Sequence, residues 1–404
     1  MDLKKRLAQL DRLSRRPASA GDPSNRNTQA DPSAVASTRS AAIAGLGLGE
    51  SATDAGPVWS CGHRDVLPGP GDPLPNLREF FSRTVDFEVD PGQILFLDTE
   101  TTGLAGGTGT IPFLVGVSWW EKGGFTTRQY FLPGPGHEAA MIQELSFLAA
   151  GFRIVVTFNG ASFDLPLLRT RARLNRLEDP LAGLVVWDLL VPARRLYGNR
   201  LPDCRQQTLE REVCDVRRDE GDIEGSRIPQ VWFDFLATGE AGLLPRVMTH
   251  NHRDMVGMGR LFNLVVEAAN SLVTGFGSPD NPNWLDGWAL GRICERRRDT
   301  EAALAYLGVS VATAPRHGPG GLGDPRFLAD AVRILKRGGD WLLVERVIND
   351  GLSAGVDEPW LHREAAILYE HRLGKWPKAL DHALKSGDDH RVARLRRLLD
   401  QSTS

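Results

Sequence analysis

Two carboxylates spaced two residues apart could bind a metal ion together. They are Asp98 and Glu100, in the string D-T-E-T-T-G-L at 98–104, which directly follows the apolar run at 93–97. On an extended chain, the side chains of residues i and i+2 point to the same side. Carboxylate oxygens are hard ligands that suit Mg²⁺ or Mn²⁺. The pair indicates metal-assisted chemistry, although a bare D-x-E is also compatible with a strand that ends in an acidic turn.

The residues around this pair make the string more specific. Gly103 frees the backbone to turn and lets a substrate approach closely, and Thr99, Thr101 and Leu104 are neighbouring candidates for substrate contacts. The whole string, placed after an apolar strand, resembles the first motif of the DEDD superfamily of 3′–5′ exonucleases, whose fold is ribonuclease H-like. The resemblance implies that two further aspartates complete the site.

The second motif of that superfamily is an aspartate at the start of a helix. The string N-G-A-S-F-D at 159–164 matches it and puts Asp164 near the start of a helix expected at 163–174. Asn159 either orients Asp164, contacts a nucleotide, or is only a turn residue. Asp188, after a short strand at 184–187, is either another carboxylate near the cleft or a helix N-cap.

The third motif is an aspartate on a late helix, and H-N-H-R-D at 250–254 supplies it. His250 lies one turn before Asp254 on the same helix face, whereas His252 points elsewhere. The superfamily commonly has Tyr-x-x-x-Asp or His-x-x-x-x-Asp, so this chain has a histidine at the tyrosine spacing. Either His250 is the base that orients the water, or the mechanism differs in detail. An inactive descendant that only binds stays open.

Longer strings narrow the resemblance to one branch. The string from 98 to 110, the string L-P-D-C-R-Q-Q-T-L-E-R-E-V at 201–213 and H-N-x-x-D together resemble the YprB-like branch of ribonuclease H-like proteins. The resemblance covers about 77–275. Because members of this branch often carry C-terminal tetratricopeptide-like repeats, it also implies helical repeats in the remainder of the chain.

The resemblance implies a two-metal cleavage of phosphodiester bonds. Four carboxylates in one cleft repel each other unless cations are present, and two Mg²⁺ or Mn²⁺ ions could activate a water and stabilise the leaving 3′-oxygen. Asp98 would bridge both ions, Glu100 and Asp254 would complete the site that holds the attacking water, and Asp164 would help to hold the other ion. His250 could accept a proton from that water or orient it.

The elements that must position these residues follow from periodicity. Short apolar runs at 93–97, 113–119, 153–158 and 184–187 predict strands, and 125–131 is predicted as a further strand joined to 113–119 by the turn K-G-G at 122–124. Helical patterns occur at 137–148 and 163–174, and the chain then looks helical to about 273. Three strands in hairpin order followed by strand–helix alternation predict a mixed α/β sheet flanked by helices. With the resemblance, we expect the ribonuclease H-like fold over 76–275.

The two ends of the chain differ from this middle part. Residues 17–75 are rich in Ala, Ser, Gly, Pro and Asp, which cannot bury enough apolar surface to offset the ordering entropy. We therefore expect 1–75 to be a disordered tail and linker. A break at 275–283 precedes a weak repeat, in which 288–304 resembles 364–380. This predicts an all-α domain of tetratricopeptide-like repeats at 284–400, with a plain helical bundle as the alternative.

Composition excludes several classes of protein. The net charge of −3 argues against a protein that coats nucleic acid through bulk positive charge. Four scattered cysteines without a C-x-x-C pair argue against a disulfide framework and a zinc ribbon, and suit the reducing cytoplasm. No apolar stretch reaches the length that a membrane-spanning helix needs.

These patterns predict a metal-dependent 3′–5′ exonuclease that acts on a nucleic-acid 3′ end. The alternatives are a catalytically weak scaffold that binds nucleic acid and recruits a protein partner through its repeats, and a structure-specific endonuclease. The choice between DNA and RNA depends on contacts to the 2′-hydroxyl, which no motif reports. Candidate cations for substrate phosphates, each of which could equally be a solvated surface charge, are Arg194, Arg195, Arg200 and Arg205.

Overall fold

The chain forms two compact units. The computed structural model describes residues 32–72, 74–81, 83, 85–103, 108–218, 221–274, 284–316 and 320–402. The first unit contains the described parts of Met1–Leu74, Arg83–Leu190 and Gln206–Asn263, and the second contains those of Pro75–Ser82, Val191–Arg205 and Leu264–Ser404. The domain boundaries at 76–275 and 284–400 stay predictions from the sequence.

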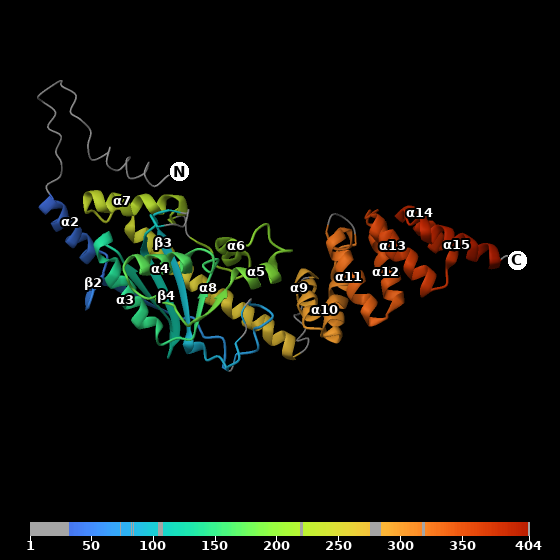
Figure 1. Ribbon diagram of the computed structural model, residues 1–404, viewed down its shortest axis with the longest axis horizontal. Helices are drawn as coiled ribbons and strands as arrows, with labels where there is room; N and C mark the ends of the chain where they lie inside the picture. The colour runs from blue at the N-terminus through green and yellow to red at the C-terminus, as the bar shows by residue number, and fades with distance from the viewer. Residues whose placement is uncertain are drawn as a thin grey trace, which may run out of the picture. The chain divides into compact units, whose positions relative to one another are not determined.

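The first unit is built on a seven-stranded mixed sheet (Figure 1). Its strand order is β1-β2-β5-β4-β3-β6-β7, in which β3, β6 and β7 run parallel and the remaining neighbours are antiparallel. The strands are β1 (Gly49–Thr53), β2 (Gly56–Asp65), β3 (Ile94–Thr101), β4 (Pro112–Glu121), β5 (Gly124–Phe131), β6 (Ile154–Thr157) and β7 (Val185–Asp188). The five strands predicted from the sequence are β3 to β7, and all are present. This confirms the mixed α/β class.

The segment expected to be disordered contains regular structure. Helix α2 (Pro32–Gly45) and the β1–β2 hairpin lie within it, and β2 pairs with β5 along seven residues from Trp59 to Asp65. Val58 of β2 is buried in the core of the sheet. The expectation of disorder is wrong here because a hairpin can gain stability from backbone hydrogen bonds to an existing sheet, which composition does not report. The basic N-terminal run at 1–16 lies outside the described residues.

Strand β3 carries the first two carboxylates because its side chains alternate between two buried faces. Leu95 and Leu97 point to a core cluster that also contains residues of α3 (Glu138–Ala149), α4 (Asp164–Leu174) and α7 (Ile228–Thr238). Phe96 points the other way and contacts Phe262 of α8, with ring centroids 5.6 Å apart. Asp98 and Glu100 continue the Phe96 row, so the strand aims both carboxylates toward the α8 face.

Helix α8 (Leu244–Thr274) is the longest helix of the described residues, with 31 residues. Phe262 joins Phe96, Trp120 and Phe125 in an aromatic cluster on the sheet. This packing sets the position of the preceding turns of α8, which carry His250 and Asp254. Within the described ranges, neither α8 nor any other helix combines the length and the apolar character that crossing a bilayer requires.

The second unit is all-helical in its C-terminal part. Its helices pack as successive neighbours, α9 on α10, α11 on α12 and α13 on α14, followed by α15 (Figure 1). The helices are α5 (Leu190–Tyr197), α9 (Trp284–Arg296), α10 (Thr300–Thr313), α11 (Pro325–Gly338), α12 (Trp341–Ser353), α13 (Pro359–His371), α14 (Trp376–Ser386) and α15 (Asp389–Ser402). The all-α region agrees with the sequence, and its likeness to tetratricopeptide repeats stays a prediction.

Candidate functional site

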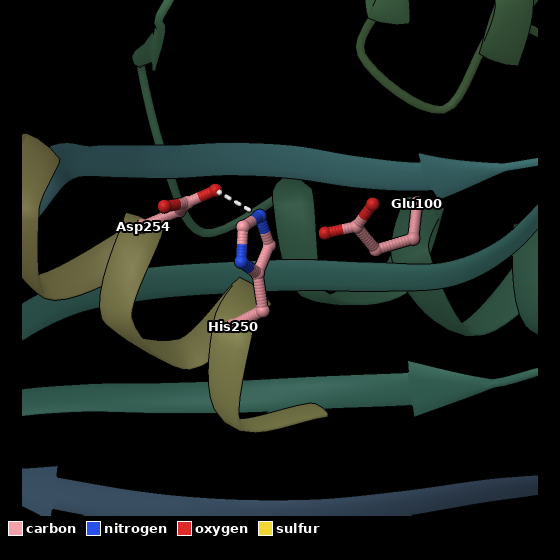
Figure 2. Close-up of side chains that lie close together, drawn as sticks. All are labelled: Glu100, His250 and Asp254. Atoms are coloured by element: carbon pink, nitrogen blue, oxygen red, sulfur yellow. Dashed lines mark ion pairs between the residues drawn. The ribbon is translucent and has the colours of Figure 1, made fainter. Parts of the chain in front are cut away.

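Three side chains from β3 and α8 converge at one point. Glu100, His250 and Asp254 each offer a ligand atom, and these atoms lie within 4.8 Å of one another (Figure 2). His250 and Asp254 lie one turn apart on α8, with His250 Nε2 3.4 Å from Asp254 Oδ2. Glu100 faces them from the sheet. The helix spacing and the strand alternation read from the sequence therefore bring these residues together.

Asp98 is held by an asparagine of α8. Asn251 Nδ2 donates to Asp98 Oδ2 at 2.9 Å, and Gln129 Nε2 donates to Asn251 Oδ1 at 2.8 Å. Asp98, Gly116 and Gln129 are direct partners across β3, β4 and β5. A Cβ on Gly116 would lie 2.3 Å from Asn251 Oδ1, so only glycine leaves room for the Asn251 amide. The amide thus bridges Asp98 and Gln129 above the sheet and holds the Asp98 carboxylate in place.

Asp164 reaches the same region from the other side of β3. It begins α4 and is 7% exposed, and Thr99 Oγ1 donates a hydrogen bond to its Oδ1. A Cβ on Gly160 would lie 2.7 Å from Asp164 Oδ2, so glycine at this turn lets the carboxylate pack closely. The turn itself is held by Asp188, which accepts from the backbone N–H groups of Asn159 at 2.8 Å and Ala161 at 3.1 Å.

The pKa values of the four clustered carboxylates, Asp98, Glu100, Asp164 and Asp254, are all raised, in each case chiefly by burial. Burial raises the pKa of Asp98 well above its ordinary value, and the charges of Asp164 and Asp254 raise it further. The pKa of Glu100 is also well raised, by burial and then by the same three neighbouring carboxylates. Burial raises the pKa of Asp164 to about 6 although the Thr99 hydroxyl stabilises its charged form. The cluster therefore holds unfavourable negative charge that cations would relieve.

One arginine partly neutralises this charge. Arg218 donates to Asp254 Oδ1 and, through Nε, to Glu210 Oε2 at 2.7 Å. Burial disfavours its charge, but Asp254 and Glu210 more than compensate and raise the Arg218 pKa. Burial raises the pKa of Asp254 although His250 and Arg218 both lower it. A single guanidinium thus faces an excess of carboxylates.

His250 has a carboxylate partner on its other ring nitrogen. Its Nδ1 lies 2.8 Å from Asp222 Oδ1, while its Nε2 faces Asp254. Burial raises the Asp222 pKa, but hydrogen bonds from His250 and Arg218 outweigh it and leave that pKa below its ordinary value. An ionised Asp222 accepts from Nδ1–H and thereby leaves Nε2 with the lone pair toward the cluster, the arrangement that a general base requires.

The roles of the predicted substrate-contact residues stay predictions, and the structure shows where the described ones lie. Thr99 is buried and bonded to Asp164, and Thr101 Oγ1 donates to the Gly103 carbonyl at 3.0 Å. Both hydroxyls therefore have partners within the protein. Leu104 lies outside the described residues. Asn159 adopts φ 63° in its turn, which agrees with the turn-residue alternative.

The N-cap interpretation of Asp188 is confirmed. Its Oδ1 accepts from Leu190 N–H at 3.0 Å, at the start of α5. The same carboxylate holds the Asn159–Ala161 turn. Asp188 therefore supports Asp164 through the backbone, and its charge is one of the smaller causes that raise the Asp164 pKa.

The residues that support the cluster, Asn251 and Arg218, were not predicted from the sequence. Asn251 lies inside the H-N-x-x-D string, but its contact with Asp98 depends on Gly116 and Gln129, which are far away in the sequence. Arg218 belongs to a run of charged residues at 217–220 that resembles a solvated loop. A buried role could have been recognised only from the excess of carboxylates that Arg218 faces.

The donor set suits a divalent cation. Carboxylate oxygens and one imidazole nitrogen lie within 4.8 Å of one another, and neighbouring carboxyl groups have raised pKa values. The hard carboxylate oxygens of this group fit Mg²⁺ or Mn²⁺. The group found together is Glu100, His250 and Asp254, whereas Asp98 and Asp164 are linked to it through their charges. Asp254 also binds Arg218, so a cation at Asp254 would compete with that guanidinium.

Comparisons with known proteins place this site in a family context. A family model described as the RNase_H superfamily matches residues 95–266. This range contains the predicted site residues Asp98, Glu100, Asp164, His250 and Asp254. The chain is 33% identical over 216 residues to the uncharacterized protein YprB of Bacillus subtilis (strain 168). This alignment covers 53% of the chain and 50% of the relative, so the chain spans about half the length of the curated relative it matches.

The match and the sheet agree on the fold. Residues 95–266 form a domain of the ribonuclease H superfamily, which confirms the resemblance drawn from the sequence. The family match supports a hydrolase that acts on nucleic acid. Nucleases of this superfamily generally use divalent metal ions, in agreement with the donor set around Glu100 and Asp254.

Proposed function

We propose that this protein is a metal-dependent 3′–5′ exonuclease of the DEDD type. The observation that carries the proposal is the convergence of Glu100, His250 and Asp254, next to two aspartates, Asp98 and Asp164, whose pKa values are raised chiefly by burial. Such a site is costly to maintain without cations. Its location in a ribonuclease H superfamily domain makes phosphodiester hydrolysis the chemistry it supports best.

In this proposal the carboxylates hold two ions. Two bound Mg²⁺ or Mn²⁺ ions would activate the attacking water and stabilise the leaving 3′-oxygen. The ions would be held by Asp98, Glu100, Asp164 and Asp254. Asn251 and Thr99 already orient Asp98 and Asp164 by hydrogen bonds, which keeps the ligands in position before metal binds.

His250 would take the proton from the attacking water. Its Nε2 faces the cluster while Asp222 contacts Nδ1 at 2.8 Å. The Asp222 contact orients the imidazole ring of His250, so the ring can serve as the base although this histidine lies at the spacing where the superfamily has tyrosine. The DEDD family resemblance supplies the expected product, a nucleoside 5′-monophosphate released from a nucleic-acid 3′ end.

The remaining parts of the proposal concern partners. The helical hairpins of the second unit are proposed to bind a protein, since stacked hairpins present extended surfaces for this purpose. The reducing cytoplasm is the proposed location, and the described cysteines are all free thiols. The substrate is a nucleic-acid 3′ end, with the choice of DNA or RNA left to the experiment below.

The test is an exonuclease assay on purified protein. Single-stranded DNA and RNA labelled at the 5′ end are incubated with Mg²⁺, Mn²⁺ or EDTA. We expect a ladder that shortens from the 3′ end, requires the metal, and falls by at least about a hundredfold in Asp98→Ala and Asp164→Ala. Asp234→Ala is the matched control, because Asp234 is an exposed carboxylate on α7 whose partner is Gln230.

Other products would contradict the proposal. Metal-dependent internal cuts would identify an endonuclease that uses the same carboxylates. Intact DNA and RNA under every condition, with folded protein that still binds nucleic acid, would favour the binding scaffold. Activity that survives Asp98→Ala would exclude this cluster as the catalytic site.

A further inference from the structure

A basic pocket lies beside the carboxylate cluster in the first unit. Its volume is about 340 Å³. One wall is the face of α8 that carries His252, Arg253 and Arg260, and the other is the segment that contains Arg217 and Arg218. The residues of α8 recur at three- and four-residue spacing, which places them in one row along the helix. The pocket is thus a surface that two elements build together.

The charges of this pocket do not cancel. Glu210 and Asp65, the carboxylates that line it, face Arg218 and His252 respectively, at 2.7 Å and 2.8 Å. Within the part of the chain that the structure describes, Arg217 and Arg260 form no ion pair. Both are exposed side chains. Among the described residues that line the pocket, positive charges therefore outnumber negative ones, in a protein whose net charge is −3.

Arg218 connects the pocket to the carboxylate cluster. Its guanidinium lines the pocket and also binds Asp254. Gly257 shapes the contact between the walls, because a Cβ there would lie 2.1 Å from Glu210 Oε1. A ligand in the pocket would therefore lie next to the residues at which the proposed hydrolysis takes place.

We propose that this pocket binds a phosphate group of the nucleic-acid strand whose 3′ end enters the carboxylate cluster. Arg217 and Arg260 supply the charge, and Arg218 forms the wall shared with the cluster. The inference rests on the proposed function for the identity of the strand, whereas the recognition of phosphate rests on the pocket alone.

Phosphate is the ligand that fits this chemistry best. The planar guanidinium presents its N–H donors in a fork that matches two phosphate oxygens, and such charge-assisted bonds are about twice as strong as neutral ones. The carboxylate cluster repels the nucleic-acid strand when metal is absent. The guanidinium groups beside the cluster would keep the phosphate backbone in position. These contacts are independent of base identity and therefore suit an enzyme that moves along a strand.

The test measures binding apart from hydrolysis. Fluorescence anisotropy is recorded for a 5′-labelled single-stranded oligonucleotide in Ca²⁺, over a range of salt, with wild type and Arg217→Ala/Arg260→Ala. We expect the dissociation constant to rise about tenfold or more. The slope of log affinity against log salt should become shallower by roughly 0.7 for each phosphate that the protein no longer neutralises.

Two matched variants accompany the pair. Arg173→Ala/Arg227→Ala removes the same charge from two exposed sites outside the pocket, and we expect at most a small effect. Arg217→Lys/Arg260→Lys keeps the charge, so it should retain the salt slope while losing part of the affinity. Thermal melting of each variant checks that the protein remains folded.

A second arm identifies the source of the phosphate. Inorganic phosphate and a nucleoside 5′-monophosphate are added while melting is recorded. If either one stabilises wild type but not Arg217→Ala/Arg260→Ala, and oligonucleotide binding is unchanged, the pocket takes a free phosphate group. If neither ligand nor oligonucleotide distinguishes this pair from the control pair, the pocket is not a phosphate site.

The two proposals fail separately. The phosphate-pocket proposal would stand and the exonuclease proposal would fail if Arg217→Ala/Arg260→Ala bound the oligonucleotide more weakly while the wild-type protein hydrolysed neither DNA nor RNA. Normal 3′–5′ hydrolysis with unchanged binding in Arg217→Ala/Arg260→Ala would preserve the exonuclease and overturn the pocket.

Discussion

At the scale of single residues, the orientation of Asp98 depends on a neutral amide. Asn251 is fully buried, and both ends of its amide are used, one by Asp98 and the other by Gln129. Gln129 Nε2 also donates to the Met248 carbonyl at 2.9 Å. Because Gln129 presents its N–H₂ group, the amide of Asn251 must present its own N–H₂ group to Asp98. The network therefore holds Asp98 in one orientation before any metal binds.

Replacing Asn251 should weaken metal binding more than it weakens the fold. Asn251→Leu removes the donor to Asp98 and leaves Gln129 without one acceptor. Partners that orient metal ligands commonly contribute tenfold to a hundredfold in affinity, so we expect at least about a tenfold rise in the Mn²⁺ dissociation constant, measured by titration calorimetry. Asn263→Leu is the control, since Asn263 lies on the same helix but donates to the Pro68 carbonyl.

The outcome separates positioning from packing. A positioning role predicts weak Mn²⁺ binding in Asn251→Leu at a temperature where the variant is still folded. An unchanged Mn²⁺ dissociation constant together with a lower melting temperature would show that Asn251 serves only the core.

The residues that could be predicted are those whose role is local. Asp98 and Glu100 follow from alternation along one strand, and His250 and Asp254 follow from one helical turn. Asn251 and Arg218 could not be predicted, because their roles arise from partners brought together by the sheet and by a loop. Whether the predicted residues perform catalysis remains a proposal that the assays above test.

At the scale of elements, the site requires close contact between β4 and α8. Gly116 of β4 lies directly beside Asp98, and an added Cβ would meet Asn251 Oδ1 at 2.3 Å and its Cγ at 3.0 Å. Asn251 cannot move aside cheaply because it is buried and bonded at both ends. A larger residue at 116 would therefore push the helix and the strand apart at the carboxylates.

Gly116→Ala should destabilise the protein and disturb the site together. Overpacking of a filled interior typically costs about 1–3 kcal/mol, which we expect in the free energy of unfolding by urea. The Mn²⁺ affinity should fall as well, because Asn251 is displaced from Asp98. Gly62→Ala on β2 is the control, since a Cβ there meets only Thr127 O, at an ordinary 3.7 Å. Equal effects of the two substitutions would contradict this account of the β4–α8 contact.

Elements differ in how well the sequence predicts them. Strands β3, β4, β6 and β7 were recognised from short apolar runs, and β5 from its aromatic residues and the Gly-containing turn before it. Strands β1 and β2 were missed because their sequences, G-E-S-A-T and G-P-V-W-S-C-G-H-R-D, lack such a run. Strand β1 pairs with β2 and β2 pairs with β5, and such pairing partners cannot be read from composition.

At the scale of the whole molecule, the two units should respond to pH in opposite directions. The first unit contains the carboxylates with raised pKa values. The second contains His382, whose Nδ1 lies 2.8 Å from His362 Nδ1 and whose ring stacks on Tyr369. Burial, and then the charge of His362, lower the His382 pKa below 6.5. The charges of Lys378 and Lys385 lower it further, whereas Asp381 opposes the shift.

The signs follow from which state binds protons more tightly. Asp164 has a pKa of about 6 in the folded protein against 3.8 as its ordinary value. Its contribution to stability is therefore complete below 3.8 and is lost as the pH rises through about 6. His382 has the opposite sign. Its contribution is complete above 6.5 and is lost as the pH falls through its lowered folded pKa, because the unfolded chain then binds the proton more readily.

Calorimetry of the full chain in EDTA between pH 4.5 and pH 8 tests this opposition. We expect one unfolding transition to move to lower temperature as the pH rises and another to move to lower temperature as the pH falls. Asp164→Asn keeps an acceptor for Thr99 but no longer titrates, so it should stabilise the first transition at pH 8 by up to about 3 kcal/mol, and by only about 1 kcal/mol near pH 4.5. His382→Phe keeps an aromatic ring stacked on Tyr369 but no longer titrates. It should reduce the pH dependence of the second transition temperature and leave the first transition unchanged. Two transitions that shift in the same direction with pH, or an Asp164→Asn variant that gains as much stability at pH 4.5 as at pH 8, would contradict the assignment.

Adding Mn²⁺ at pH 8 should raise the temperature of the first transition alone, because the carboxylates whose repulsion lowers that transition belong to the first unit.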